Sequence, residues 1–457
     1  MKKILAILVG KIIIFLSPFL KLGGGTSAPG KIALKIYPKL LEDSRKIFKK
    51  GVILITGTNG KTTTTKLLVE ILKTAGFSVI YNSGGSNLPR GIISAILKKQ
   101  PLLGKAEVDF GVFEVDEAYL GQVIKNLNPS LVILGNLFRD QLDRYGEIDI
   151  LAQKWEKALK FLPKNSFVLA NSDDPTIISF AEKFHNVKFF GVENLQTFKT
   201  NPEHIADTIY CKKCFIPLRY SKIFFSHIGK YFCPNCSFKN PKIDFIFKNP
   251  QLDKGKIKGK ICFQNKCFPI TVNLEGTYNF YNLLAAVSAA FLLKIESQVI
   301  KKGLENFSAA FGRQEEIFYK NRKIKIILVK NPTGFNQALD ILKNSEKVHS
   351  ILFLLNDNIA DGKDVSWIWD VDFESLPHKF ELFFGGRRAY DMALRLKYAG
   401  QIIKKENIST NIKAIFEKAV SKTPLPNTIF IFPSYTALLD LRNYLQKILP
   451  IKKFWEE

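Results

Sequence analysis

The sequence lacks several features that define well-known classes of protein. Six cysteines in 457 residues are too few for a disulfide scaffold. Glycine and proline, with 29 and 20 residues, are not enriched, so collagen-like and low-complexity chains are excluded. Acidic residues are scarce beside basic ones, 41 against 67, and the net charge is +26. This excess indicates either a compositional bias or a phosphate-bearing partner, such as a nucleotide, a nucleic acid or an anionic membrane.

The N-terminal region is apolar, but no unbroken apolar run reaches the roughly 20 residues that a membrane-spanning helix needs. Two shorter runs, Ile4–Gly10 and Ile12–Leu20, follow Lys2 and Lys3 and are separated by Lys11. They predict either a helix that lies in the membrane interface or a helix that packs on the protein. No small-residue cleavage site follows them, which argues against a signal peptide. We therefore expect a cytoplasmic chain, peripheral at the inner face of the cell membrane if the interfacial helix forms.

The pattern of strands and helices divides the chain into three parts. Residues 1–45 form an apolar, basic helical segment. Residues 46–310 alternate strands and helices, which is typical of an α/β domain with a mostly parallel, doubly wound sheet. This alternation stops at about 202–270, where cysteines, aromatics and lysines cluster, and we interpret that stretch as an insertion. Residues 311–457 predict a second α/β domain.

The strongest local signal is a glycine-rich loop between an expected strand, Val52–Thr56, and an expected helix, Thr62–Ala75. Glycines let backbone N–H groups approach phosphate oxygens, a lysine supplies positive charge, and a threonine hydroxyl can bind Mg²⁺. Ile55 stands where the usual spacing has its first glycine, so the loop is a shortened variant. It predicts ATP binding by the following residues: Gly57, Thr58, Asn59, Gly60, Lys61, Thr62 and Thr63.

A magnesium ion at this loop also needs a carboxylate ligand. Glu114 lies at the end of an expected strand, Phe110–Val115, and is followed by Asp116 and Glu117. Strand ends of an open parallel sheet face the ligand crevice. We therefore expect Thr62 and Glu114 to bind Mg²⁺, and the alternative is an acidic loop in solvent.

Two Cys-x-x-Cys pairs, Cys211/Cys214 and Cys233/Cys236, have the spacing of a four-cysteine zinc site. Because cysteine fills all four ligand positions, we expect a structural zinc ribbon and not a catalytic zinc. The remaining cysteines, Cys262 and Cys267, flank a short turn and are expected to be neighbours across two strands.

An acidic segment, Asp357–Asp370, follows the expected strand Ser350–Leu355 and contains Asp364, Trp367 and Trp369. Its spacing does not match a calcium-binding loop. It is either a functional surface or a structural turn anchored by the tryptophans. No histidine lies in a signature with a nucleophilic cysteine or serine, which disfavours a hydrolase that relies on this chain alone.

Taken together, these segments resemble the Mur ligase superfamily, the ATP-dependent amide-bond-forming enzymes of peptidoglycan assembly. Gly276–Asn282 is similar to the family motif G-x-H-N-x-x-N, with Tyr278 in place of histidine, and Gly312–Glu315 is similar to G-R-x-E. Within the superfamily, three features look like the synthetase subunit of lipid II isoglutaminyl synthase. They are the cysteine insertion, the segment Asn136–Glu147, and the pair formed by Lys330–Gly334 and the acidic segment.

The resemblance implies a reaction and a partner. ATP would activate the α-carboxylate of the D-glutamate residue in lipid II as an acyl phosphate, and ammonia would then displace phosphate to give D-isoglutamine. The ammonia would come from a separate GatD-like glutamine amidotransferase, in which Asp364 would complete the Cys/His pair. Asn282 and Arg313 would contact the nucleotide. Gln141 stands where many members of the family carry a metal-binding histidine.

Two other functions are compatible with parts of the sequence. One is a Mur-type ligase that adds an amino acid instead of ammonia. The other is a nucleic-acid-binding ATPase with a zinc ribbon. The cysteine region has no obvious pattern of base-stacking residues and the chain has no helicase motif, so we expect no nucleic-acid partner.

Overall fold

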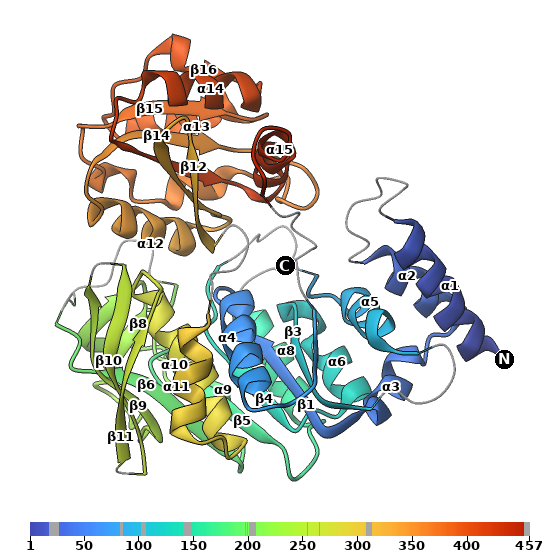
Figure 1. Ribbon diagram of the computed structural model, residues 1–457. Coiled ribbons are helices and arrows are strands. Elements are labelled where there is room, and N and C mark those ends of the chain that lie inside the picture. The colour runs from blue at the N-terminus through green and yellow to red at the C-terminus, as the bar shows by residue number, and fades with distance from the viewer. Residues whose placement is uncertain are drawn as a thin grey trace. The chain divides into compact units, whose positions relative to one another are not determined.

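The computed structural model describes residues 1–17, 27–82, 86–101, 107–139, 148–196, 198, 200, 207–253, 255–264, 266–307 and 313–451. The chain folds into two compact units (Figure 1). The first contains the described residues up to 138 and from 148 to 307, and the second contains Arg139 and the described residues from 313 to 451.

The first unit begins with three helices, α1 (Lys2–Leu16), α2 (Ala28–Ile36) and α3 (Leu40–Ser44). Helix α1 packs on α2 and on α5 (Pro89–Lys99). A Cβ at Gly10 would lie 2.6 Å from a methyl carbon of Leu97 and 3.6 Å from Ala33, so glycine permits this close packing. Among the described residues, none of the helices combines the length and the apolar character that crossing a membrane requires.

Within the described residues, the first unit contains one nine-stranded sheet in the order β11-β10-β9-β6-β5-β4-β1-β3-β2. The neighbouring strands in the part β9-β6-β5-β4-β1-β3-β2 pair in parallel. Strand β10 pairs antiparallel with both β9 and β11. The mostly parallel sheet expected from the sequence is therefore confirmed. The strands are β1 (Phe48–Thr56), β2 (Val79–Tyr81), β3 (Val108–Glu114), β4 (Leu131–Leu134), β5 (Phe167–Asn171), β6 (Val187–Glu193), β9 (Phe245–Asp253), β10 (Lys256–Phe263) and β11 (Lys266–Val272).

Helices pack on this sheet in two groups. One contains α4 (Lys61–Thr74), α10 (Tyr278–Leu292) and α11 (Ser297–Glu305), and the other contains α6 (Leu120–Leu127), α8 (Ile148–Leu159) and α9 (Pro175–Ala181). Leu68 and Ile71 of α4 and Leu284 of α10 are fully buried in one apolar cluster with strand residues. Strand β1 is apolar without alternation from Val52 to Ile55 because helices bury both faces of a parallel sheet.

The insertion is shorter than its expected range of 202–270. Among the described residues of this range, only a hairpin and the cysteine-bearing loops beside it stand apart from the central sheet. The hairpin consists of β7 (Arg219–Phe225) and β8 (Ile228–Phe232). Strand β9 pairs in parallel with β6, and β10 and β11 continue the same sheet. The polar residues of these strands hide their membership of the sheet, because one face of this part of the sheet is open to water and exposed residues stand among the buried ones.

The second unit is also α/β, as expected. Its described residues form a six-stranded sheet in the order β12-β13-β17-β14-β15-β16, which is parallel except for β12 and β13. The strands are β12 (Arg313–Tyr319), β13 (Arg322–Ile327), β14 (Val348–Leu354), β15 (Glu381–Gly385), β16 (Ile408–Ser409) and β17 (Thr428–Pro433). The helices are α12 (Pro332–Lys343), α13 (Ala389–Tyr398), α14 (Ile412–Lys422) and α15 (Tyr435–Leu445).

Candidate functional site

The glycine-rich loop connects β1 to the N-terminus of α4, in the expected strand–loop–helix arrangement. Gly60, the residue before the helix, has a left-handed backbone with φ of 86°. A Cβ at this position would also lie 1.9 Å from Oδ1 of Asn282. Glycine is therefore required for two independent reasons. The open backbone N–H groups at the start of a 14-residue helix fit a phosphate group.

Lys61 is the charged centre of the loop, and its side chain is only 8% exposed. Its Nζ donates to the carbonyl oxygens of Gly57, at 2.5 Å, and Thr58, at 3.3 Å. It also forms an ion pair with Glu117, with 3.0 Å between Nζ and Oε1. The sequence placed Glu117 only in an acidic run, so its pairing with the loop lysine is a contact that sequence reasoning missed.

Thr62 and Glu114 lie together as the magnesium prediction requires. The hydroxyl of Thr62 donates to Oε2 of Glu114 over 2.8 Å, and Glu114 is 1% exposed. Asn82 fixes the end of β3, because its side chain bonds both the N–H and the carbonyl oxygen of Glu114. A hydroxyl and a carboxylate at the end of a strand are oxygen ligands of the kind that Mg²⁺ prefers, so this pair fits the ion.

The other predicted nucleotide residues divide into described and undescribed ones. Thr58 and Asn59 bond the segment Asn136–Phe138, and Thr63 is buried in the first turn of α4. Asn282 is buried next to the loop, where it accepts a hydrogen bond from Thr64 over 3.5 Å. The side chain of Arg313 lies outside the described residues. So does Gln141, which stands where many family members carry a metal-binding histidine.

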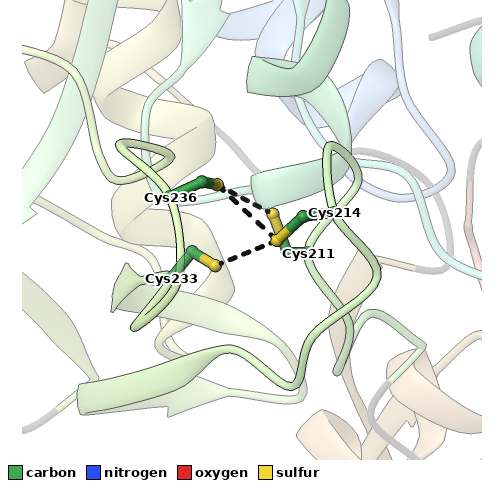
Figure 2. Close-up of side chains that lie close together, drawn as sticks. All are labelled: Cys211, Cys214, Cys233 and Cys236. Carbon is green, nitrogen blue, oxygen red and sulfur yellow. Dashed lines mark hydrogen bonds between the residues drawn. The ribbon is translucent and has the colours of Figure 1, made fainter.

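The four predicted zinc ligands come together as two facing loops (Figure 2). Their sulfur atoms all lie within 4.8 Å of one another, and three Sγ–Sγ distances are 3.6, 3.4 and 3.7 Å. Tetrahedral zinc with Zn–S bonds of about 2.3 Å separates its sulfur ligands by about 3.8 Å, so the group fits zinc.

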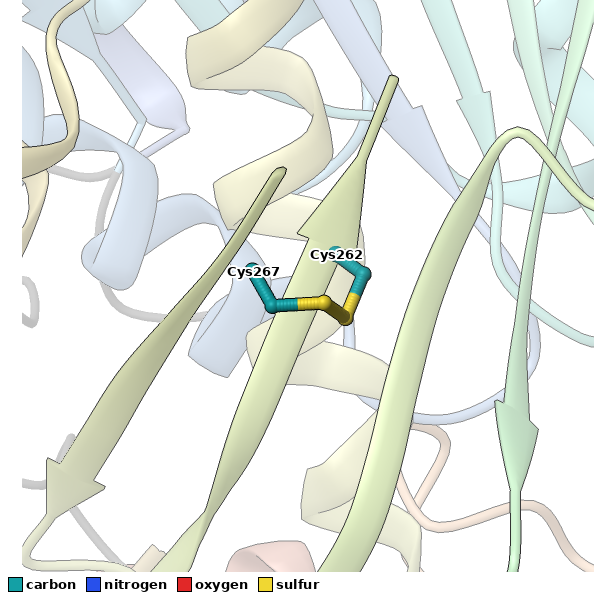
Figure 3. The surroundings of a disulfide bond; sticks show 2 residues. All are labelled: Cys262 and Cys267. Atoms are coloured by element: carbon teal, nitrogen blue, oxygen red, sulfur yellow. A yellow bond between two sulfur atoms is a disulfide. The ribbon is translucent and has the colours of Figure 1, made fainter. Parts of the chain in front are cut away.

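Cys262 and Cys267 are opposite each other on β10 and β11, as expected, and their sulfur atoms are joined in a disulfide (Figure 3). They lie on the strands that extend the central sheet. They are therefore separate from the four-cysteine group in the part of the chain that the structure describes.

In the second unit, the acidic segment Asp357–Asp370 follows β14 (Val348–Leu354). Some of its residues are buried and others are exposed. Asp361 is 8% exposed and accepts hydrogen bonds from the N–H and the hydroxyl of Thr436 at the start of α15. Asp364 is exposed, and its Oδ1 accepts from the N–H of Ser366 over 2.8 Å. That backbone hydrogen bond, with a second from the Ser366 side chain, lowers the pKa of Asp364, so its carboxylate is ionised at neutral pH.

Comparison with known proteins assigns both units to one family. The Mur ligase middle domain matches residues 55–290, and the MurT ligase C-terminal domain matches residues 328–438. The MurT subunit of the glutamine-hydrolysing lipid II isoglutaminyl synthase of Streptococcus pneumoniae is 33% identical over 441 residues, 95% of each chain. The chain belongs to the MurT family of Mur ligases. The resemblance seen in the sequence motifs is thereby confirmed, and MurT chains are Mur-type ATP-dependent ligases.

Two further comparisons support the MurT assignment. The MurT subunit of the same enzyme from Staphylococcus aureus strain COL is 30% identical over 429 residues and covers 93% of each chain. Among solved structures, a pseudomurein peptide ligase type C from Methanothermus fervidus is similar, with a TM-score of 0.68 and 25% identity. This likeness covers 92% of this chain and 84% of the other. The Mur ligase fold therefore extends through both units.

Proposed function

We propose that this chain is the synthetase subunit of a lipid II isoglutaminyl synthase. It would convert the α-carboxylate of the D-glutamate residue in lipid II to an amide. A carboxylate oxygen attacks the γ-phosphorus of ATP, the bond to the bridging β–γ oxygen breaks, and ADP leaves. Ammonia then attacks the acyl carbon of the acyl phosphate, loses a proton and expels phosphate. The observation that carries the proposal is the enclosed group of Lys61, Thr62 and Glu114 in a chain of the MurT family.

The phosphate loop supplies the electrostatic part of this reaction. Its N–H groups and the Lys61 ammonium would hold the β- and γ-phosphates. Mg²⁺ held by Thr62 and Glu114 would offset the charge of the migrating phosphoryl group. Glu117 and two loop carbonyls hold the ammonium of Lys61. We propose that phosphate oxygens take over part of this coordination, and that Asn282 and Arg313 complete the nucleotide site.

The ammonia would come from a GatD-like glutaminase subunit. The curated relatives are named as subunits of a glutamine-hydrolysing enzyme. An exposed, ionised Asp364 is suited to a site completed between two chains, because a carboxylate can hold a partner's histidine in its reactive tautomer. We propose that Asp364 does this for a Cys/His pair of the partner.

The proposal is tested by reconstitution with lipid II, MgATP and glutamine. The chain alone is expected to amidate lipid II only when ammonium is supplied, and glutamine is expected to work only after a GatD-like protein is added. Mass spectrometry separates the products, since amidation and amino-acid addition change the substrate mass differently. If the chain alone joins an amino acid to a muropeptide precursor, the amino-acid-adding alternative is correct.

We propose that the four cysteines bind a structural zinc. The purified chain should contain one zinc ion, measured by elemental mass spectrometry. Cys211→Ser should lower the zinc content and the unfolding temperature, because structural zinc contributes to folding free energy. The turnover number at saturating MgATP should change little in the folded fraction. A variant that is fully folded but catalytically dead would contradict a structural role.

We also propose that α1 contacts an anionic membrane. Its buried residues Ala6, Ile7 and Gly10 face the protein. The opposite side exposes large apolar side chains, with Phe15 at 70%, and lysines stand beside it. This combination is typical of a helix that lies in the interface. The chain should float with vesicles that contain phosphatidylglycerol, and replacing both Leu8 and Phe15 by serine should abolish flotation. Equal flotation of the variant would contradict the proposal.

A further inference from the structure

The phosphate loop has a second wall that comes from a distant part of the sequence. Asn136 bonds Asn59 through both ends of its side-chain amide, and its carbonyl oxygen accepts from the N–H of Thr58. The N–H of Phe138 donates to the hydroxyl of Thr58, which donates back to the Phe138 carbonyl oxygen. The segment Asn136–Phe138 therefore sets the position of the loop backbone.

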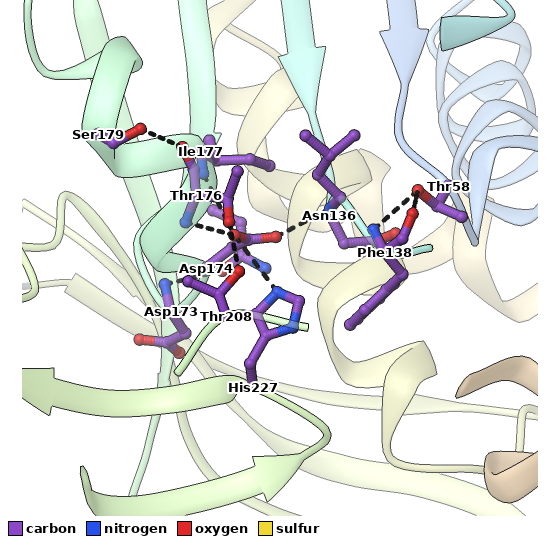
Figure 4. Close-up of polar contacts among 12 residues, drawn as sticks. Thr58, Asn136, Phe138, Asp173, Asp174, Thr176, Ile177, Ser179, Thr208 and His227 are labelled. Atoms are coloured by element: carbon purple, nitrogen blue, oxygen red, sulfur yellow. Dashed lines mark hydrogen bonds and ion pairs between the residues drawn. The ribbon is translucent and has the colours of Figure 1, made fainter. Parts of the chain in front are cut away.

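This wall is held from behind by Asp174 and by the tip of the insertion (Figure 4). Oδ2 of Asp174 accepts from the N–H of Leu137 over 2.9 Å, and Oδ1 caps the N-terminus of α9. His227 lies in the tight turn between β7 and β8 and is fully buried. Its Nε2 lies 3.6 Å from Oδ1 of Asp174, and its ring centroid lies 4.8 Å from that of Phe138.

Asp173 connects the same hairpin to the other wall of the loop. Its Oδ1 binds Nζ of Lys230, at 2.6 Å, and the side chain of Asn240, and its carbonyl oxygen accepts from Gly229. Its Oδ2 accepts from the hydroxyl of Tyr281 over 2.8 Å. Burial raises the pKa of Tyr281, so the phenol keeps its proton and donates. Tyr281 precedes Asn282, the residue that closes over Gly60. Both carboxylates are fully buried.

The cysteine end of the insertion gives this hairpin a fixed base. Cys211 and Cys233 are buried in a cluster with Tyr231 of β8 and Ile178 of α9. The cluster therefore packs on the helix whose N-terminus Asp174 caps. The insertion is attached at its cysteine end to α9 and at its tip to both walls of the phosphate loop.

We propose that the insertion positions the nucleotide site, and that His227 is the positioning residue at its tip. The imidazole, wedged between Phe138 and Asp174, keeps the segment Asn136–Phe138 against Thr58 and Asn59. A phosphate loop binds tightly only when its N–H groups are already aimed at the oxygens, so a displaced wall weakens nucleotide binding. The inference rests on the proposed ATP site and adds a function for the insertion.

The test measures the dissociation constant of MgAMP-PNP, a non-hydrolysable ATP analogue, by calorimetry on the full chain. His227→Leu keeps the volume but removes both ring nitrogens, and it should raise the dissociation constant about five-fold or more. His227→Gln keeps a polar N–H group beside the buried Asp174 carboxylate and should bind within about two-fold of the wild type. Phe245→Leu is the matched control, because it changes a fully buried ring of β9, outside the hairpin. It should lower the unfolding temperature with a change in affinity below about two-fold.

Unchanged affinity of His227→Leu, equal weakening by His227→Gln, or equal weakening by Phe245→Leu would overturn the positioning role. If His227→Leu does not fold, Asp174→Asn tests the same contact from the other side, and a folded variant with wild-type affinity would overturn the inference. Absence of nucleotide binding by the wild type would instead contradict the proposed function.

Discussion

The phosphate loop and the acidic segment Asp357–Asp370 occupy similar places in their sheets but present their charges in opposite ways. Each follows a parallel strand, β1 in the first unit and β14 in the second. In the first, Lys61, Glu114 and Glu117 are exposed by only 8%, 1% and 5%. In the second, Asp361 is turned inward but Asp364 is exposed.

This difference in the exposure of the charged side chains suits two different tasks, phosphoryl transfer and contact with a second protein. A phosphoryl transfer requires opposite charges in a site shielded from water, where their interactions are strongest. A residue that serves a second protein must be accessible before that protein binds. Asp361 anchors the acidic segment on α15, and this leaves Asp364 free to face outward in a fixed loop. The two units would therefore divide ligation and partner activation between them.

The largest effect should come from Lys61, since the enclosed site would lose the cation that faces the phosphates. Lys61→Ala is expected to reduce amidation at least about 10³-fold, with ammonium and with glutamine alike. Lys73→Ala, on the exposed side of the same helix, is the matched control and should retain full activity. Initial rates of amide formation measure both. Normal rates for Lys61→Ala would remove the loop from the mechanism.

Replacing Asp364 should affect only one of the two nitrogen sources. Asp364→Asn is expected to reduce glutamine-driven amidation about 10²-fold or more, because an amide cannot hold the partner's histidine in the required tautomer. Ammonium-driven amidation by the same variant should stay at the wild-type rate. Asp372→Asn, another exposed carboxylate nearby, controls for the loss of charge. Wild-type glutamine-driven rates in Asp364→Asn would exclude the proposed role.

Glu117→Gln should give an intermediate effect in the enclosed site. It leaves the buried ammonium of Lys61 without its counter-charge, which disturbs the position of Nζ. We expect the turnover number to fall about ten-fold with either nitrogen source. Glu70→Gln, on the exposed side of α4, should have no such effect. If only glutamine-driven activity fell, the separation of the two units' functions would be wrong.

The smallest effect should come from the pair Arg395–Glu374, which contributes to the stability of the acidic segment. Arg395 donates to the carbonyl oxygens of Ile368 and Val371 and pairs with Glu374, and this hydrogen bond lowers the pKa of Glu374. A lowered folded-state pKa gives stability that is present above the unfolded value of 4.5 and is lost as the pH falls through the folded pKa. A carboxyl group titrates between about pH 6 and about pH 3. Over this range the unfolding temperature of the wild type should fall more than that of Glu374→Gln. Parallel curves for the two proteins would show that the pair contributes nothing.

The motifs that could be found in the sequence are those whose functional residues lie close together along the chain. The phosphate loop could be predicted because strand, glycines, lysine and helix follow one another, and the cysteine pairs because metal ligands recur at fixed spacing. The position of Glu114 beside Thr62 could be predicted from its place at the end of a strand. The expected range of the insertion, 202–270, wrongly included strands β9 to β11 of the central sheet, because these strands carry many polar residues and lack the apolar runs of the other parallel strands.

The sequence by itself determined the fold class, the family and the residues of the phosphate loop, because local spacing and apolar periodicity encode them. Tertiary structure alone decided which distant residues complete the site. Glu117 lies 56 positions from Lys61, and Asn136 lies 77 positions from Asn59. His227, on the insertion, has no local signature at all, and only the packing of its hairpin brings it against Phe138. Such contacts depend on how separate elements pack, and the burial that makes them strong exists only in the folded chain.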